Sequence, residues 1–293
     1  MVRAVPSPAP LVSLIVPTRD RPDLLGMCVE GLLTRTDYPE IEILIVDHES
    51  KLPETFELFE KLQMDGRVRI IPYVGPFNFS AINNMAVTKA KGSIIGLINN
   101  DIDVINPDWL SEMVSLSVMT GVGAVGAKLM YPDDRVQHAG VVLGVSGVAN
   151  HFNHAMARSN SGYFGRNLLT SQVSAVTGAC LVVRKSVFEE AGGLNETDLA
   201  VAYNDVDFCL RLKKMGYRNI WTPHAELYHH ESATRGAEHT PENAERFQRE
   251  SQYMRAKWGN EIDHDAFYNE NFSTDISECF QLAFPPRRKK PWL

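Results

Sequence analysis

The sequence predicts an α/β fold with a mostly parallel central sheet flanked by helices. First, short apolar runs such as "LVSLIVP" (11–17) and "EIEILIVD" (40–47) alternate along the chain with amphipathic segments. Second, these runs are apolar almost throughout, which is typical of strands covered on both faces of a parallel sheet. Third, the segments between them are long enough for the crossover helices of βαβ units.

The same patterns give each element in order. Strands are expected at residues 11–17, 40–47, 68–73, 93–99, 121–131, 174–184 and 219–231. Helices are expected at residues 22–35, 52–63, 78–92, 106–119, 185–193, 205–216 and 241–258. Gly92 and Gly216 are expected to end their helices, and Asn106 and Pro107 are expected at the N-cap and first helical positions of theirs. Residues 132–172 are polar, rich in Gly, His and Asn, and carry no clear period.

This order indicates one α/β domain with an appended part. Residues 1–10 form a loose lead-in, and residues 11–236 form the domain, with a first half at about 11–105 and a second at about 106–236. Residues 237–293 form a helical extension with a basic, proline-rich tail. The tail segment from Arg287 to Trp292 fits a solvated tail, or a linker to a further domain of a longer protein, better than a contact with an anionic lipid surface.

Composition limits the function classes. The chain has 293 residues, 44% hydrophobic and 22% charged, with a formal net charge of −7, so nucleic acid is not expected as a partner. Four scattered cysteines without a CxxC pair indicate reduced thiols; they are Cys28, Cys180, Cys209 and Cys279. No stretch approaches the ~20 apolar residues of a membrane span, and the start does not resemble a signal peptide. A cytoplasmic protein is expected, with peripheral contact at the inner face of the plasma membrane as the further option.

Acidic residues gather where predicted strands end. Asp47, Asp101 and Asp103 follow strands, and Asp205 precedes a helix. Ligands of open parallel sheets bind beyond the carboxyl ends of the strands. Carboxylates there can hold a hard divalent cation, Mg²⁺ or Mn²⁺ rather than zinc, or hydrogen-bond a ribose or base. Each acid alone is also explained as a helix cap or loop residue.

Two further positions carry candidate chemistry. His229 and His230 end the last strand, either as a surface pair or with one imidazole completing a metal site begun by Asp101. Asp205 lies at a helix N-terminus, where it is an N-cap or a general base whose ionised form the helix dipole favours. His151 and His154 lie in the unassigned polar stretch and are interpreted as surface residues.

Two other enzyme classes are disfavoured. "GVGAVG" (121–126) matches the dinucleotide motif GxGxxG, but it follows a helix and enters an apolar run, the reverse of the required context. A sugar nucleotidyltransferase needs a glycine-containing phosphate loop after the first strand, and "PTRDRPDLL" (17–25) has no glycine. Nothing resembles a nucleophile elbow or a Cys–His pair.

Together these segments resemble the family 2 glycosyltransferases, which have the GT-A fold. The resemblance runs through "VSLIVPTRDRPDLL", "LIVDHES", "NFSAINNMAVTKAKGSIIGLINNDIDV", "VTGACLVVRKSVFEEAGGLNE", "YNDVDFCLRLKKMGY" and "ELYHHES", over roughly residues 11–236. Within the family the chain is similar to bacterial transferases of O-antigen, capsule and other surface polysaccharides, including rhamnosyltransferase-like members. The resemblance makes residues 11–105 the donor half and 106–236 the acceptor half.

The resemblance also implies roles for particular residues. The implied donor-binding residues are Pro17, Thr18, Arg21, Asp47, Asn84, Asn99, Asn100 and Asp101. Asp101 and His229 would hold Mn²⁺ or Mg²⁺, and Asp205 stands at the position of the catalytic base. Asp103, Asn204 and His230 are accessory candidates.

Three departures from the family pattern are visible. Asn99 replaces the first acid of the DxD motif, "DHES" replaces "DNGS" or "DDGS", and Asn204 replaces the Glu before the catalytic Asp. The metal ligand and the base are retained. The implied reaction is inverting, metal-dependent transfer from a UDP-, dTDP- or GDP-linked sugar to a hydroxyl of a glycan or glycolipid, a growing lipid-linked surface polysaccharide. The alternative is a catalytically silent nucleotide- or glycan-binding module of the same fold.

Overall fold

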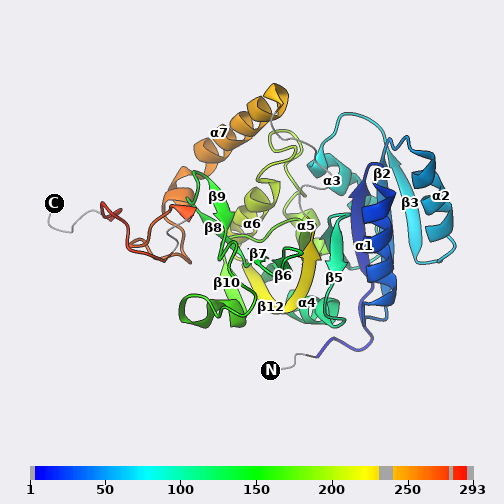
Figure 1. The fold of residues 1–293 in the computed structure, drawn as a ribbon, viewed down its shortest axis with the longest axis horizontal. Coiled ribbons are helices and arrows are strands. Elements are labelled where there is room, and N and C mark those ends of the chain that lie inside the picture. The colour runs from blue at the N-terminus through cyan, green and yellow to red at the C-terminus, as the bar shows by residue number, and fades with distance from the viewer. Residues whose placement is uncertain (1–3, 231–239, 277–279, 289–293) are drawn as a thin grey trace.

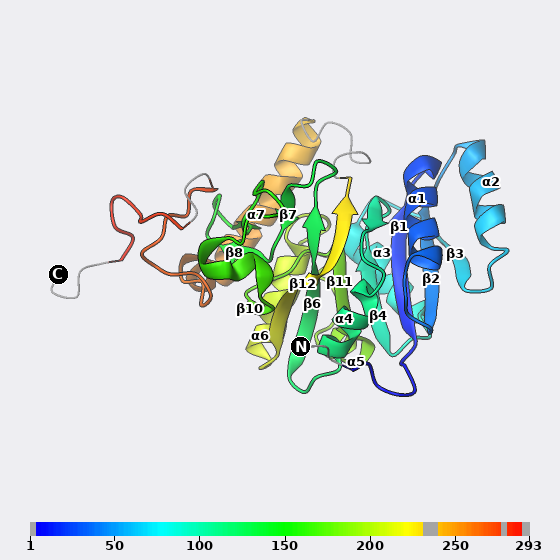
Figure 2. The ribbon, with the colours of Figure 1, turned by 60° about the horizontal axis from the view of Figure 1, so that its bottom comes forward.

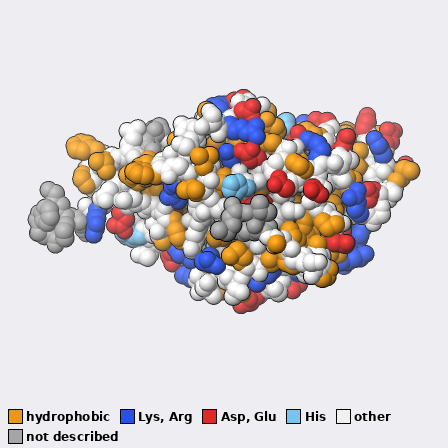
Figure 3. All heavy atoms as spheres, turned by 90° about the horizontal axis from the view of Figure 1, so that it is seen from below, with side chains coloured by type: hydrophobic (Ala, Val, Ile, Leu, Met, Phe, Trp, Pro, Cys, Tyr) orange, Lys and Arg blue, Asp and Glu red, His pale blue; other side chains and the backbone are white. Residues whose placement is uncertain are grey.

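The computed structural model describes residues 4–230, 240–276 and 280–288. Cys279, Glu231 and the tail beyond Arg288 lie outside these residues. In Figure 1 the sheet runs through the centre, with the first strands and helices at one end and the C-terminal segments at the other. Within the described ranges, no helix is both long and apolar enough to cross a bilayer. Acidic and basic side chains are interspersed on the face that Figure 3 shows.

The elements follow the expected alternation. The strands are β1 (Val12–Thr18), β2 (Ile41–His48), β3 (Val68–Tyr73), β4 (Ile94–Ile98), β5 (Ile102–Val104), β6 (Val122–Met130), β7 (Val136–His138), β8 (Val141–Leu143), β9 (Ala149–His151), β10 (Ser171–Val173), β11 (Cys180–Arg184) and β12 (Arg218–His229). The helices are α1 (Pro22–Thr34), α2 (Pro53–Leu62), α3 (Phe79–Lys89), α4 (Trp109–Ser117), α5 (Lys185–Glu190), α6 (Asn204–Lys214) and α7 (Pro241–Asp263), with a 3₁₀ segment η1 (Tyr163–Leu168).

The main sheet has the strand order β10-β12-β6-β11-β4-β1-β2-β3. Strands β3, β2, β1 and β4 are all parallel, as the sequence predicts. Strand β11 is antiparallel to both β4 and β6, whereas β12 is parallel to β6, so the second half of the sheet is mixed. The parallel half therefore brings the carboxyl ends of β1, β2 and β4 to one edge.

Helices cover both faces of the sheet, as Figure 2 shows. Leu14 and Val16 of β1 lie in one apolar core with side chains of α1, α2 and α4. Ile15 lies in the other core, with α3, α5, α6 and α7. Successive side chains of a strand point to opposite faces, so a strand covered on both sides is apolar at every position.

Helix α7 fixes the segment that leads into α6. The buried Glu250 side chain accepts hydrogen bonds from the backbone N–H groups of Val201 (3.0 Å) and Ala202 (2.9 Å). Tyr203 follows in the left-handed region (φ 59°), and α6 begins at the next residue. This anchoring positions the first turn of α6, which carries Asp205.

The helix ends agree only partly with the sequence prediction. Gly216 ends α6 with φ 89°, as predicted. The prediction for α4 was wrong, because the helix begins at Trp109 and the Asn106 side chain bonds instead to the backbone of His224 (2.9 Å) and Glu226 (2.6 Å) in β12. Gly92 does not end α3, which stops at Lys89. A Cβ on Gly92 would lie 2.6 Å from the carbonyl oxygen of Leu11, so this glycine allows close approach to β1.

The strand predicted at 174–184 is shorter. Only Cys180–Arg184 forms the paired strand β11. Backbone groups of residues 174–179 form hydrogen bonds with other partners instead. Ala175 bridges to Val141, and the N–H of Gly178 donates to Asp205. The unassigned stretch 132–172 contains the short strands β7, β8 and β9 and the η1 segment.

Candidate functional site

Six predicted residues gather at the carboxyl ends of the strands and the start of α6. We call this group the strand-end site; it consists of Thr18, Asn99, Asn100, Asp101, Asp205 and His229. Strand β1 supplies Thr18, and the loop after β4 supplies Asn99, Asn100 and Asp101. Strand β12 supplies His229, because β12 runs antiparallel to β5 and pairs His229 with Ile102. Residues from both halves of the chain therefore meet at this edge.

Asp101 and His229 form the centre of the strand-end site. Oδ1 of Asp101 lies 3.1 Å from Nε2 of His229, and both side chains are buried. Nδ2 of Asn99 lies 3.2 Å from the same imidazole nitrogen. The other ring nitrogen, Nδ1, donates to Oε1 of Gln137 over 2.6 Å. The imidazole is therefore held on both sides, with Nε2 directed at the carboxylate.

This donor set fits a divalent cation. With Nδ1 as the donor, a neutral ring presents its Nε2 lone pair to a carboxylate oxygen, an arrangement that a cation between the two would stabilise. Adjacent ligands of an octahedral ion at ~2.1 Å are about 3 Å apart, which matches the observed 3.1 Å. Among the residues that the structure describes, no group of three or more His, Cys, Asp or Glu side chains could hold a metal. Asp101 and His229 are thus two candidate ligands, fewer than such a group.

Hydrogen bonds join the loop after β1 to the loop after β2, on one side of the Asp101–His229 pair. Nδ2 of Asn100 donates to Oγ1 of Thr18 (3.1 Å). The N–H of Asp20 donates to Oγ of Ser50 (2.8 Å), and the N–H of Ser50 donates to Oδ1 of Asp47 (3.1 Å). Thr18 and Asp47 are thereby held at neighbouring strand ends, where β1 and β2 are in register.

Two other predicted residues belong to this loop region. Pro17 lies in β1, paired with Val46. Arg21 has φ 53° at the N-terminus of α1 and bonds to Asp23 through two nitrogens, at 3.0 and 2.8 Å. The bond to Asp23 raises the pKa of Arg21, and the charge of Asp101 contributes to the same shift. Arg21 therefore lies within electrostatic reach of the strand-end site.

Asp205 lies in the first turn of α6, not at its N-cap. Oδ2 accepts the N–H of Gly178 (2.8 Å) and Oδ1 accepts the N–H of Val206 (2.8 Å). Burial raises the pKa of this carboxyl above its ordinary value, although the bonds from Gly178 and Val206 lower it. A carboxylate with a raised pKa is a stronger base, which is the property that proton abstraction requires.

Asp207, two residues further along α6, has other partners than Asp205. Its fully buried carboxylate bonds to Nε of Arg211, Nζ of Lys257 and Nε1 of Trp258, each at 2.8 Å. Burial alone would raise the pKa of Asp207, but these three donors lower it below the ordinary value. Asp207 therefore joins α6 to α7, and the two acids of one helix turn have opposite environments.

The structure does not bring the accessory candidates into the same contacts. Asp103 pairs with Arg35 on α1. Nδ2 of Asn204 donates to the carbonyl of Val201 (2.9 Å). The N–H of His230 donates to the carbonyl of Asp101 (3.0 Å), so His230 contacts Asp101 through its backbone. These contacts give the side chains of Asp103 and Asn204 structural roles.

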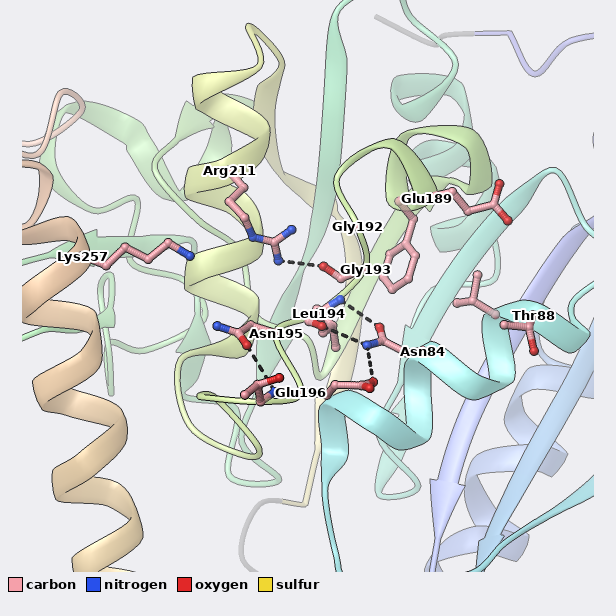
Figure 4. Close-up of a pocket in the computed structure, with 13 residues that line it drawn as sticks. Asn84, Thr88, Glu189, Gly192, Gly193, Leu194, Asn195, Glu196, Arg211 and Lys257 are labelled. Carbon is pink, nitrogen blue, oxygen red and sulfur yellow. Dashed lines mark hydrogen bonds between the residues drawn. The ribbon is translucent and has the colours of Figure 1, made fainter.

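Asn84 likewise lies apart from the strand-end site. Its amide donates to the carbonyl of Leu194 (2.9 Å) and to Glu196 (2.8 Å), and it accepts the N–H of Leu194 (2.8 Å). Figure 4 shows these bonds at a cavity of about 570 Å³ between α3, α6 and α7, with Arg211 and Lys257 on its other side. Asn84 therefore holds the loop after α5.

Sequence reasoning missed Gln137 and Gly178. Gln137 lies in the aperiodic stretch 132–172, and Gly178 lies within a segment predicted as strand, so no local signal marks either residue. The two histidines interpreted as surface residues have partners: Nδ1 of His151 lies 2.9 Å from Nδ1 of His138, and Nε2 of His154 lies 2.9 Å from the hydroxyl of Tyr131. The dinucleotide-like glycines enter the buried strand β6, so their context is inverted as predicted.

The family profile described as Glycosyl transferase family 2 matches residues 13–192, more than half of the chain. This chain belongs to glycosyltransferase family 2. A second profile, Glycosyl transferase family group 2, matches residues 121–268. The matched ranges include the residues of the strand-end site from both halves of the sheet.

Relatives of this family 2 glycosyltransferase domain are longer proteins. It is 49% identical over 277 residues to the uncharacterized protein y4gI of Sinorhizobium fredii, covering 94% of this chain and 30% of that one. It is 44% identical over 234 residues to the O-antigen biosynthesis protein RfbC of Myxococcus xanthus, covering 80% of this chain and 18% of that one. The chain thus spans less than a third of the length of either relative.

A solved structure confirms the GT-A fold of this glycosyltransferase. The mannosyltransferase PcManGT of Pyrobaculum calidifontis, in complex with GDP-Man and Mn²⁺, superposes with a TM-score of 0.58 at 20% sequence identity. The match covers 80% of this chain and 61% of that one. At this identity the likeness concerns the fold.

Proposed function

We propose that this chain is the catalytic domain of an inverting, metal-dependent glycosyltransferase that extends a cell-surface polysaccharide. The observation that supports the proposal is a chain of hydrogen bonds that links the Asp101–His229 pair to Asp205. The N–H of Asn99 donates to the carbonyl of Ala179 (2.9 Å), and the adjacent Gly178 donates to Asp205. A two-residue segment thus joins a cation-binding pair to a carboxylate with a raised pKa.

In this proposal Asp101 and His229 hold Mn²⁺ or Mg²⁺. When bound, the cation supplies charge stabilisation to the diphosphate of the donor and of the departing nucleoside diphosphate. Thr18, Asn100 and Asp47 line the adjacent strand ends, where the nucleoside would lie, with Pro17 in β1 and Arg21 at the start of α1 nearby in the chain. Mn²⁺ and GDP-Man in the complex of PcManGT support a donor of this class.

The chain's own residues account for the group transfer. Asp205 accepts the proton of an acceptor hydroxyl while that oxygen forms a bond to the anomeric carbon of the sugar. The bond from that carbon to the diphosphate oxygen breaks on the opposite side, and the leaving nucleoside diphosphate keeps the electron pair. One displacement inverts the anomeric centre and needs no covalent enzyme intermediate. The raised pKa of Asp205 favours the proton transfer.

The acceptor class rests on the relatives. The O-antigen biosynthesis protein RfbC supports a surface-polysaccharide substrate, which we propose to be lipid-linked and reached from the cytoplasmic side of the membrane. The short share of each relative that this chain covers supports a place within a longer, multi-domain protein. The division into a donor half (11–105), an acceptor half (106–236) and a C-terminal extension (237–293) belongs to the same proposal.

The test is donor binding by calorimetry with a panel of UDP-, dTDP- and GDP-sugars, in Mn²⁺ and in EDTA. Asp101→Ala is compared with Asp103→Ala, a matched control because Asp103 pairs with Arg35 instead of His229. We expect binding of one nucleotide class that needs metal, is lost in Asp101→Ala and persists in Asp103→Ala. Binding that ignores both metal and Asp101, or no binding at all, would overturn the proposal. Binding without turnover by any acceptor would favour the silent module.

A further inference from the structure

A short strand outside the predicted site lies directly behind the imidazole of His229. Strand β7 pairs antiparallel with β6, and its central residue, Gln137, is 2% exposed. Oε1 of Gln137 lies 2.6 Å from Nδ1 of His229, whereas Nε2 faces Asp101 and Asn99. Oε1 of Gln137 therefore meets the side of the ring that faces away from the carboxylate.

The chemistry of these contacts determines where the ring proton lies. A carboxamide oxygen only accepts hydrogen bonds, so the nitrogen facing it must carry the proton. The amide nitrogen of Asn99 only donates, and it faces Nε2, which agrees with a lone pair there. Gln137 therefore requires a proton on Nδ1. At Nε2 the donor Asn99 favours a lone pair, whereas the Asp101 carboxylate, 3.1 Å away, only accepts hydrogen bonds. The tautomer protonated at Nδ1, with its lone pair on Nε2, is the form that a cation between Nε2 and Asp101 would bind.

We propose that Gln137 is a positioning residue that fixes this tautomer and ring orientation of His229 and thereby sets the affinity of the strand-end site for Mn²⁺ or Mg²⁺. The inference rests on the proposed function, because it assigns His229 to that cation. Partners on the outer nitrogen of a metal-binding histidine orient the ring and raise its basicity, and their loss typically costs about 10–100-fold in metal affinity. Buried on a paired strand, Gln137 has little freedom to move away.

Two substitutions separate positioning from packing. Gln137→Met keeps the length and approximate volume of the side chain but removes the acceptor oxygen. Gln137→Glu keeps an acceptor facing Nδ1. Gln172→Met is the matched control, because Gln172 is exposed on β10. A role in packing alone would leave the tautomer of His229 unchanged in all three variants.

The first measurement is the tautomer itself, by long-range ¹H–¹⁵N NMR of histidine-labelled protein at pH 8, where histidine side chains are ordinarily neutral. His229→Asn assigns the signal. We expect Nδ1 to carry a proton in the wild type, in Gln137→Glu and in Gln172→Met, and that proton to be lost in favour of Nε2–H in Gln137→Met. An unchanged Nδ1–H tautomer in a folded Gln137→Met protein overturns the proposal.

The second measurement is binding of Mn²⁺ alone, from the electron paramagnetic resonance signal of the free ion. We expect Gln137→Met to bind about 10–100-fold more weakly and Gln137→Glu and Gln172→Met to bind within a few-fold of the wild type. Equal affinity in Gln137→Met overturns the proposal. If the wild type binds no Mn²⁺, the metal-dependent function fails, and the NMR result still decides whether Gln137 fixes the tautomer.

Discussion

The N–H of Asn99 donates to the carbonyl of Ala179 over 2.9 Å and joins the end of β4 to the segment that holds Asp205. The side chain of Asn99 also contacts His229, so one residue touches both the Asp101–His229 pair and the segment that holds the Asp205 carboxylate. One backbone hydrogen bond and the side chains of Asn99 and Asp205 thus link the Asp101–His229 pair to Asp205. Rigid placement of this kind favours a transfer in which donor and acceptor must meet in one geometry.

Asp205→Asn is expected to remove the acid–base contribution to transfer. The amide cannot take a proton, so the rate of transfer should fall about 10²–10⁴-fold, while donor binding stays within a few-fold. Steady-state kinetics with the donor found by calorimetry measures the first effect, and calorimetry measures the second. A variant that retains more than a tenth of the wild-type rate would show that Asp205 is not the base.

The same substitution is expected to stabilise the fold at neutral pH. The folded pKa of Asp205 is raised above 3.8, so the ionised form is disfavoured in the folded state. The free energy of unfolding of the wild type therefore falls as the pH rises from 3.8 through the folded pKa, and it stays lower above that value. The Asp205→Asn variant has no ionisable carboxyl at this position, so its free energy of unfolding lacks this fall with pH.

Urea unfolding over a pH series measures this effect. The stability advantage of Asp205→Asn should be small below pH 4, grow as the pH rises and be largest at neutral pH. A stability advantage that is constant with pH, or a variant less stable than the wild type at pH 7, would show that ionisation of the buried Asp205 carboxyl does not destabilise the fold.

Asp207 lies on the same helix turn as Asp205, and Asp207→Asn is expected to have the opposite effect on stability. The substitution leaves Arg211 and Lys257 facing a neutral amide, so it should lower the free energy of unfolding by about 3 kcal/mol at pH 7. The folded pKa of Asp207 is lowered, so its contribution to stability is present above 3.8 and is lost as the pH falls through the folded value. The two variants should therefore differ in sign at neutral pH, and chemical denaturation of both settles the comparison.

The fold could be predicted from the sequence because a sheet covered on both faces leaves a strong local pattern. β1 and β2 are buried at nearly every position, and α1 between them buries residues at helical spacing, such as Leu25, Cys28 and Leu32. The strand-end acids were also predictable, since Asp101 directly follows a buried strand. Gln137 and Gly178 act through contacts with His229 and Asp205, which are distant in sequence, so their own segments carry no signal.

The role of Asn84 separates what the family resemblance implies from what the contacts indicate. The resemblance places Asn84 near the donor, but its amide makes three hydrogen bonds to Leu194 and Glu196. Asn84→Ala leaves the backbone groups of Leu194 without these partners, at a cost of about 1–3 kcal/mol in the free energy of unfolding. Nucleotide-sugar affinity should stay within a few-fold of the wild type.

Thermal or urea unfolding and donor calorimetry on this variant measure both quantities. Thr88→Ala on the same helix is the control, because its hydroxyl bonds only locally, to the carbonyl of Met85 (2.6 Å), and it should change neither quantity by much. A variant of Asn84 with wild-type stability and a tenfold or greater loss of donor affinity would restore the donor role. The loop after α5 would then have to be held by contacts other than the amide of Asn84.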